Sequence, residues 1–401
     1  MVIEINDIGL LLAVTTVVAL ICERFRLQYT VGLVLSGLAL AMLSVPIHIP
    51  LSKSLLYVAL LPPLVFEVAL RIRWSALRRN LPLVLVLAGP GLGLSAAVIA
   101  GGMHYFVGWS WAASFLFGIL ISATDPVAVV AAFDEAKVHG RVDLIVKAES
   151  LANDGTAAAA FAILLPFALG AGATPLAFAA NTGMTIAGGV LCGLAVALGV
   201  LGLAGRTSNH LVELTLTTLC AYGSFLVAEH IGGSGVIASL TAGLVVAVGI
   251  SRGVISKTGQ TALFAFWEYA AFLANSIIFI LIGLSQAKHQ IGGLVWPALI
   301  TIILTVAGRA AAVYPFCFLF RKGPLHFPLA HQHVLFWGGL RGALALALVL
   351  GLPPEIPERQ QMITLTFAVV AFSVFVQTLS LGPLLRRWGL ADKSKHDEHV
   401  D

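Results

Sequence analysis

Apolar segments of membrane-spanning length recur along almost the whole sequence, and this pattern constrains the fold more than any other feature. A soluble domain has about 25% charged residues, whereas here 10% are charged, 59% are hydrophobic and the mean hydropathy is +0.98. Runs this long predict transmembrane helices rather than the alternating segments of a membrane β-barrel. Thirteen segments are predicted, at 8–22, 28–43, 54–70, 82–104, 112–133, 145–169, 177–204, 212–229, 234–250, 261–285, 293–319, 332–351 and 361–383. The sequence therefore predicts an all-α polytopic membrane protein with about 13 transmembrane helices, and no separate catalytic or nucleic-acid-binding domain.

Basic residues are concentrated in every second connection between these segments. Of the 23 Lys and Arg residues, eighteen fall in connections that share one side of the membrane. The other connections hold only Lys53, Lys288 and Arg359, and the remaining two basic residues, Arg309 and Arg341, lie inside segments. The positive-inside rule then predicts an outside N-terminus and a cytoplasmic C-terminus in a cell inner membrane.

The order of the segments suggests one membrane domain, 1–401, with internal symmetry. We expect segments one to six (1–170) and eight to thirteen (212–385) to form two inverted repeats, joined by a linking helix at 177–204. A short cytoplasmic tail follows at 386–401. The order of the segments alone carries this inference, because no residue-by-residue repeat is evident.

The fifth segment contains Asp125-Pro126 in an otherwise apolar run. Proline lacks a backbone N–H and disfavours the helical conformation of the residue before it, so we expect the helix to break here. A break at mid-membrane frees backbone groups that can bind ions. The alternative is a simple proline kink with Asp125 hydrogen-bonded to its neighbours.

The sixth segment carries a polar cluster from Glu149 to Gly155. At about 100° per residue, Ser150 and Asp154 lie about 40° apart on one helix face and can share a ligand. Glu149 lies about 140° from Asp154 and therefore needs a different partner. Asn153 fits either helix packing through its amide or a functional role.

The twelfth segment contains Gly338-Gly339-Leu340-Arg341-Gly342, a second candidate break. In the two-repeat scheme it corresponds to the fifth segment. Paired interrupted helices at equivalent positions are the best sequence indication of a secondary transporter site. Arg309 lies near the middle of its own segment, which indicates a transport pathway more than an arginine reaching for the interface.

The ionisable groups inside the segments do not balance. Three carboxylates, Asp125, Glu149 and Asp154, face two permanent cations, Arg309 and Arg341. A dehydrated carboxylate without a fixed partner must take up a proton or bind a cation, so the two compete for one site. Oxygen ligands with a single net charge favour a monovalent alkali ion. No phosphate-binding G-x-x-x-x-G-K-[ST] loop and no paired cysteine spacing are present, so we expect neither ATP nor any cofactor.

In family order, these motifs resemble the monovalent cation–proton antiporters of the NhaP and NHE type. The matching residues are Leu61-Pro62-Pro63-Leu64-Val65-Phe66-Glu67, Thr124-Asp125-Pro126, Glu149-Ser150-Leu151-Ala152-Asn153-Asp154-Gly155, Asn275-Ser276, Phe279, Gly283, Arg309 and Gly339-Leu340-Arg341-Gly342. The resemblance implies an NhaA-like antiporter fold with two crossed discontinuous helices, a homodimer, and a role in pH homeostasis.

The resemblance also assigns the sodium ligands and the approach to them. It implies that Asp154 is the titrating ligand and that Asp125, Ser150 and the backbone at Thr124 complete the Na⁺ site. It implies that Glu67 lines the cytoplasmic approach to that site.

Four further positions carry roles in the same resemblance. Glu149 pairs with Arg309 to brace the core, and Arg341 offsets the half-helix dipoles at the crossing. Asn153 stands where electrogenic relatives carry a second aspartate, which implies electroneutral exchange of one H⁺ per cation.

Two other functions compete with antiport. One is a proton-coupled solute symporter on a related fold. The other is an intramembrane aspartyl protease with Asp125 and Asp154 as its catalytic dyad, although the Gly-x-Gly-Asp element of such proteases is absent around both residues.

Overall fold

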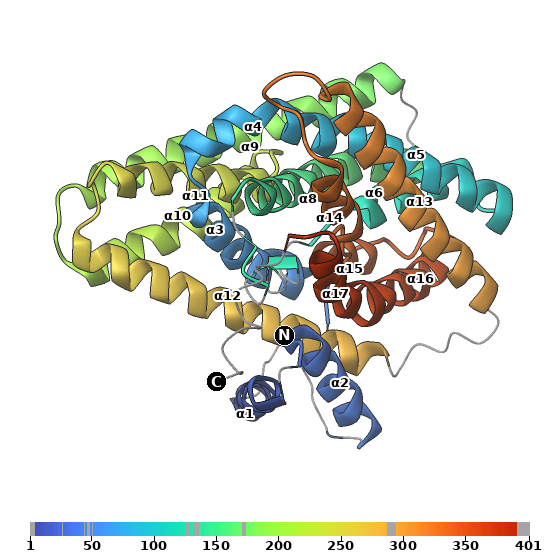
Figure 1. Cartoon of the computed structure of the whole chain (residues 1–401), viewed down its shortest axis with the longest axis horizontal. Helices are drawn as coiled ribbons and strands as arrows, with labels where there is room; N and C mark the ends of the chain where they lie inside the picture. Colours follow the sequence, from blue (N-terminus) through green and yellow to red (C-terminus); the bar gives the residue numbers. More distant parts are fainter. Residues whose placement is uncertain are drawn as a thin grey trace.

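The computed structural model describes residues 5–25, 27–43, 45, 49, 51–125, 129–130, 133, 136–138, 140–170, 174–286 and 294–390. Within these residues the chain is helical, with no β-strand (Figure 1). The α-helices are α1 (Ile5–Phe25), α2 (Tyr29–Met42), α3 (Leu61–Arg71), α4 (Trp74–Val86), α5 (Leu92–Gly102), α6 (Trp111–Ser122), α8 (Arg141–Ala168), α9 (Pro175–Ala204), α10 (His210–His230), α11 (Gly235–Ser251), α12 (Lys257–Gln286), α13 (Val295–Leu319), α14 (Leu329–Trp337), α15 (Ala343–Leu350), α16 (Arg359–Phe372) and α17 (Leu379–Arg387). Four π-helical stretches adjoin them: η1 (Ser54–Leu60), η2 (Leu87–Gly91), η3 (Met103–Val107) and η4 (Ser373–Thr378).

Each of the thirteen predicted segments overlaps at least one of these helices. In the described part of the chain, 9 continuous helical stretches are long and apolar enough to cross a membrane. The helices α2, α6 and α11 are shorter and apolar, and α14 and α15 are separated by a break. The all-α membrane fold is therefore confirmed, while the count of thirteen crossings stays a prediction.

The fourth segment is longer than the sequence indicated. It was expected at 82–104, but helix is continuous from Trp74 to Val107 through α4, η2, α5 and η3. Pro90 lies inside η2, where the wider π turn accommodates a residue that has no N–H and would clash in a regular α turn. Arg78 and Arg79, expected in a connection, consequently lie on α4.

The helix α8 lies at the centre of the molecule. It packs against α4, α6, α9 and α11 (Figure 1). The helices α9, α10 and α11 pack together, while α13 packs against α5 and α16. The helix α3 packs on α11 and α12, so it joins the second half of the chain to the neighbourhood of α8. Side chains on α8 are thus positioned by both halves of the sequence.

Hydrogen bonds join regions that are distant in the sequence, and they show which of these regions lie on the same face of the molecule. Trp109 Nε1 donates to Gln361 Oε1 at 2.8 Å, which joins a connection expected outside to the outer end of the thirteenth predicted segment. Arg141 donates to Asn80 Oδ1 at 2.8 Å and to the His326 carbonyl at 2.7 Å, which joins three regions expected inside. The alternation of connections fits this geometry, and the absolute orientation in the membrane stays a prediction.

Candidate ion-binding site

The two expected helix breaks meet in space. After α6, residues 123–125 are not helical, and between α14 and α15 the same is true of 338–342. The backbone N–H of Asp125 donates to the carbonyl of Leu340 at 2.8 Å, so each break supplies a hydrogen-bond partner for the other. Pro126, which motivated the first break, lies outside the described residues. The crossing of two interrupted helices is the central feature of the site.

Arg341 closes the end of the half-helix α6. Its Nη1 donates to the carbonyls of Ser122 and Ala123 at 3.0 and 3.1 Å, and the residue is 2% exposed. The last carbonyls of a helix carry partial negative charge, so a buried cation is favourable there. This is the placement that compensation of the half-helix dipole requires. In the described part of the chain, the hydrogen bonds of this guanidinium go to these two carbonyl oxygens.

Arg309 occupies the equivalent place at the end of α14. Its Nε and Nη2 donate to the carbonyl of Leu335 at 3.2 and 3.0 Å. Its two terminal nitrogens also bond both carboxylate oxygens of Glu149, at 2.7 and 2.8 Å, and Glu149 is fully buried. Such a bidentate pair is the strongest form of a charge-assisted hydrogen bond. The expected partners therefore lie together, and their pair is anchored to the second break.

Two polar residues that the sequence analysis missed hold the second break in place. Ser373 Oγ accepts the backbone N–H of Arg341 at 3.2 Å and donates to Gln377 Oε1 at 2.8 Å. Gln377 Nε2 in turn donates to the carbonyl of Trp337 at 3.3 Å. The sequence does place this serine and this glutamine four residues apart in an apolar segment. Residues at that spacing lie on one helix face, which indicates a shared polar contact.

Asp154 projects from α8 into a small cavity beside the first break. The cavity has a volume of about 20 Å³ and is also lined by Asp125 and Ala343, which is room for one ion or one water molecule. Asp154 is 5% exposed, and its buried Oδ1 has no hydrogen-bond partner among the described residues. None of the ion pairs formed by the described residues includes Asp154. A buried carboxylate in this state needs either a proton or a cation.

The remaining expected ligands lie together beside the first break, although none of them lines this cavity. Asn153 Nδ2 lies 3.0 Å from Thr124 Oγ1, 3.2 Å from the Ser122 carbonyl and 3.4 Å from Glu149 Oε1. Thr124 Oγ1 lies 3.4 Å from Ser150 Oγ. The Asn153 amide therefore ties α8 to the first break, while its buried Oδ1 has no partner among the described residues.

Two glycines in the second break permit close approach of charged groups. A Cβ added at Gly342 would overlap the carboxylate of Asp125, and one added at Gly339 would overlap the guanidinium of Arg309. Gly342 is the residue immediately before α15, so Asp125 lies against the N-terminal end of that helix. The positive end of a helix stabilises a carboxylate. The N-terminal end of α15 thus stabilises the charge of Asp125.

A larger cavity leads toward the site along α3. It has a volume of about 320 Å³ and is lined in part by Glu67, Arg71 and Glu268. Leu64 and Val68 line both this cavity and the small one at Asp154, so the two adjoin. Arg71 pairs with Glu67 and, at 3.1 Å, with Glu268. Glu67 accordingly lines a cavity that adjoins the one at Asp154, and its role on the cytoplasmic approach stays a prediction.

The crossed helix breaks, the buried acidic cavity and its approach define the chain as a polytopic membrane protein with the architecture of a secondary transporter. The family model described as "Sodium/hydrogen exchanger, transmembrane" matches residues 10–387. The chain therefore belongs to the sodium/hydrogen exchanger family, whose members exchange a cation for a proton across a membrane.

Curated relatives and solved structures agree with this assignment. The chain is 37% identical over 369 residues to the Na(+)/H(+) antiporter ApNhaP of Aphanothece halophytica, covering 91% of this chain and 70% of that protein. It is 31% identical over 407 residues to the Na(+)/H(+) antiporter NhaH of Halobacillus aidingensis, covering 96% and 98%. The fold matches that of the sodium proton antiporter MjNhaP1 of Methanocaldococcus jannaschii with a TM-score of 0.78 at 20% identity, over 97% and 99% of the two chains. These matches favour antiport over the symporter and protease interpretations.

The buried ion pair makes a prediction about stability. Replacement of Glu149 by Gln leaves Arg309 buried without its carboxylate, which should lower the free energy of unfolding by about 3–5 kcal/mol. The charge swap Glu149→Arg with Arg309→Glu should recover part of this loss. The free energies of unfolding of these variants are measured by circular dichroism in detergent. Asp143→Asn is the milder control, because Asp143 belongs to a more exposed ion pair. A swap no more stable than either single variant contradicts the pairing.

The close approach at Gly342 makes a second prediction. A methyl group there must displace Asp125, so Gly342→Ala should weaken cation binding and cost about 1–3 kcal/mol of stability, as overpacking does. Gly223→Ala is the matched control, because a Cβ at Gly223 meets nothing within 4 Å. Calorimetric titration of the two purified variants with Na⁺ compares their affinities for the cation. Unchanged Na⁺ affinity in Gly342→Ala would show that Asp125 does not depend on this contact.

Proposed function

We propose that this chain exchanges Na⁺, or alternatively Li⁺ or K⁺, for H⁺ by competition of cation and proton for Asp154. One observation carries the proposal: the buried Asp154 carboxylate opens on a cavity of about 20 Å³ at the crossing of two helix breaks and has an oxygen without a partner. Desolvation makes an unneutralised charge costly there. The carboxylate is therefore occupied by one cation or by one proton.

The surroundings of the other two carboxylates support Asp154 as the titrating group. Glu149 is neutralised by Arg309 through two hydrogen bonds. Asp125 lies against the N-terminal end of α15 and is bound through its own N–H to Leu340. Asp154 forms no ion pair with any described residue, so we assign to it the charge that changes during transport.

The proposed ligands are all oxygens. Asp154 and Asp125 supply carboxylates, Ser150 and Thr124 supply hydroxyl or backbone oxygens, and the free Oδ1 of Asn153 is a further acceptor. Hard oxygen donors with a low net charge suit a monovalent alkali ion. Because only one charge at the site is left to titrate, one H⁺ replaces one cation, and the exchange is electroneutral.

The proposed topology follows from the basic connections. The cavity that contains Glu67 opens on the face lined by Arg71 and Lys147, which the positive-inside rule places in the cytoplasm. The N-terminus is then outside and the C-terminus cytoplasmic. The division into repeats at 1–170 and 212–385, joined by 177–204 and followed by a tail at 386–401, is supported by the crossing of one break from each half. Homodimer formation stays a prediction that rests on the family resemblance.

Removal of the titrating carboxylate tests the mechanism. Asp154→Asn should abolish Na⁺-driven H⁺ movement in proteoliposomes loaded with a pH-sensitive dye, because the amide holds neither a proton nor the cation charge. In the unmodified protein, the KM for Na⁺ should rise by about tenfold per unit fall in pH once the site is mostly protonated, as simple competition requires. Asp143→Asn, outside the site, is the control. Full exchange by the Asp154→Asn variant would contradict the assignment of Asp154 as the titrating group.

Electroneutrality has its own test at Asn153. With the membrane voltage clamped at zero or at an inside-negative value, the initial rate of exchange should be the same, because no net charge crosses. Asn153→Asp adds a second carboxylate beside the site, and its rate should depend on voltage if the variant takes up a second proton. A voltage-dependent rate in the unmodified protein contradicts the one-to-one stoichiometry.

A further inference from the structure

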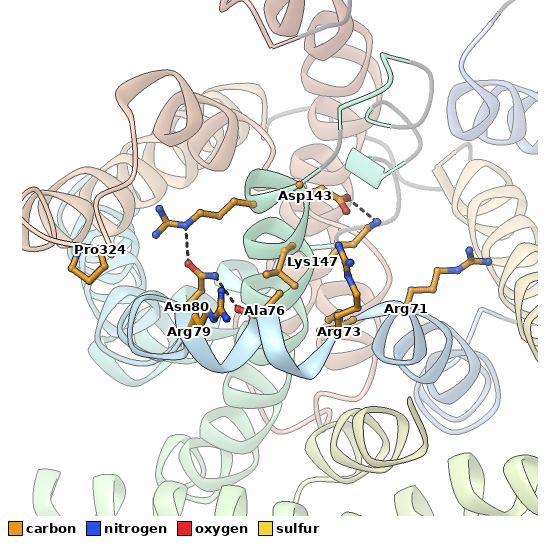
Figure 2. Close-up of a pocket in the computed structure, with 12 residues that line it drawn as sticks. Arg71, Arg73, Ala76, Arg79, Asn80, Asp143, Lys147 and Pro324 are labelled. Atoms are coloured by element: carbon orange, nitrogen blue, oxygen red, sulfur yellow. Dashed lines mark hydrogen bonds and ion pairs between the residues drawn. The ribbon is translucent and has the colours of Figure 1, made fainter. Parts of the chain in front are cut away.

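A further cavity lies apart from the ion site and is strongly basic. Its volume is about 810 Å³, and it lies where the end of α3, the start of α4 and the start of α8 meet Pro324 (Figure 2). Figure 2 shows Arg71 at one end of the cavity and Pro324 at the other, with Arg79 and Asn80 on α4 between them. Its acidic lining residue is Asp143, and its cationic lining residues are Arg71, Arg73, Arg79, Arg141 and Lys147.

Three of these five cations have no carboxylate partner in the described part of the chain. Lys147 pairs with Asp143 at 2.7 Å, and Arg71 is held by the glutamates of the ion approach. Arg141 donates to an amide oxygen and a backbone carbonyl, while its buried Nη2 has no partner. The side chains of Arg73 and Arg79 are exposed and take part in none of the ion pairs or hydrogen bonds recorded for the described residues. Like charges held together in this way attract an anion.

The start of α8 adds to the positive potential of the cavity. Gly140 and Arg141 line it, and no side chain caps this 28-residue helix at Gly140. The N-terminal end of a helix carries partial positive charge and free N–H groups, which makes it a common anion site. Asp143, in the first turn, is already neutralised by Lys147.

We propose that this cavity binds a phosphate-bearing anion, with Arg73, Arg79, Arg141 and the N-terminal end of α8 as its ligands. Guanidinium groups match phosphate because they donate two parallel hydrogen bonds in one plane. The volume lies within the range of small-molecule sites, about 300–1,000 Å³, so a phosphate group with a further substituent fits. The phosphate comes either from the headgroup of an anionic lipid or from a soluble phosphate compound.

A bound anion would act on the cation path through Arg71. That residue lines both this cavity and the approach that contains Glu67 and Glu268. An anion that draws Arg71 away from the two glutamates leaves them freer to attract cations. The anion also connects α3, which packs on α11 and α12, to α4, which packs on α8. The site therefore couples anion occupancy to the rate of cation access.

Binding can be measured without transport. Native mass spectrometry of protein taken from vesicles of phosphatidylcholine with phosphatidylglycerol, against phosphatidylcholine alone, tests the lipid source. Thermal unfolding in detergent with inorganic phosphate or pyrophosphate tests the soluble source. Arg73→Gln with Arg79→Gln should weaken the retained probe by roughly tenfold or more, because charge-assisted bonds are lost. Arg78→Gln with Arg252→Gln is the matched control, since both arginines are exposed and neither lines the cavity.

Each outcome decides for or against the anion site. Binding of either probe class that is lost in the cavity double variant and kept in the control double variant supports it and identifies the source. No binding of any probe to the unmodified protein overturns it, as does equal loss in both double variants, which indicates general surface charge. The Asp154→Asn variant, which is expected to be inactive in transport, should still bind the anion. Anion binding and ion exchange are thus measured separately, so a failure of one proposal is distinguished from a failure of the other.

Discussion

The structure depends on one constraint: backbone groups freed at a helix break inside a membrane must find partners within the protein. The two breaks meet this requirement jointly. The N–H of Asp125 bonds the carbonyl of Leu340 directly, and the carbonyls at the ends of α6 and α14 are bound by Arg341 and Arg309. Ser373 completes the arrangement at the N–H of Arg341. Each interrupted helix is thus stable only in the presence of the other.

This use of the arginines determines which acid is left to do chemistry. Arg309 serves both Leu335 and Glu149, and the hydrogen bonds of Arg341 go to carbonyls. Neither forms an ion pair with Asp154 in the described residues. In the proposed mechanism, the charge imbalance seen in the sequence therefore falls on Asp154, which lines a cavity with room for a single ion. In the proposed mechanism, the geometry that satisfies the freed backbone groups also leaves one carboxylate available to a cation.

Much of this site could be predicted because its signals are local. Asp125-Pro126 and the glycines around Arg341 mark breaks by their own conformational preferences, and Ser150 and Asp154 share a face by helical periodicity. The pairing of Glu149 with Arg309 spans 160 residues and was available only through family resemblance. For Arg341, the resemblance predicted an interaction with the half-helix dipoles. It did not predict that the hydrogen bonds go to the carbonyls of Ser122 and Ala123.

Other features depend on how distant segments come together, which one sequence does not reveal. Ser373 and Gln377 bind the second break from a different helix, and their sequence positions give no partner. The basic cavity gathers arginines from connections that the sequence placed on one side of the membrane without placing them together. The early start of α4 was missed because the predicted segment followed the apolar run 82–104, which leaves out the charged Arg78 and Arg79 on the first turns of the helix.

The most direct test of the account is the number of protons released when the purified protein binds Na⁺ at equilibrium. Calorimetric titrations in buffers of different ionisation enthalpy give this number without any transport. At a pH where Asp154 is protonated before the cation arrives, the account predicts one proton released for each Na⁺ bound, and no such release from a protein that lacks this carboxylate. Na⁺ binding without proton release at every pH would contradict the claim that the two ions share one site.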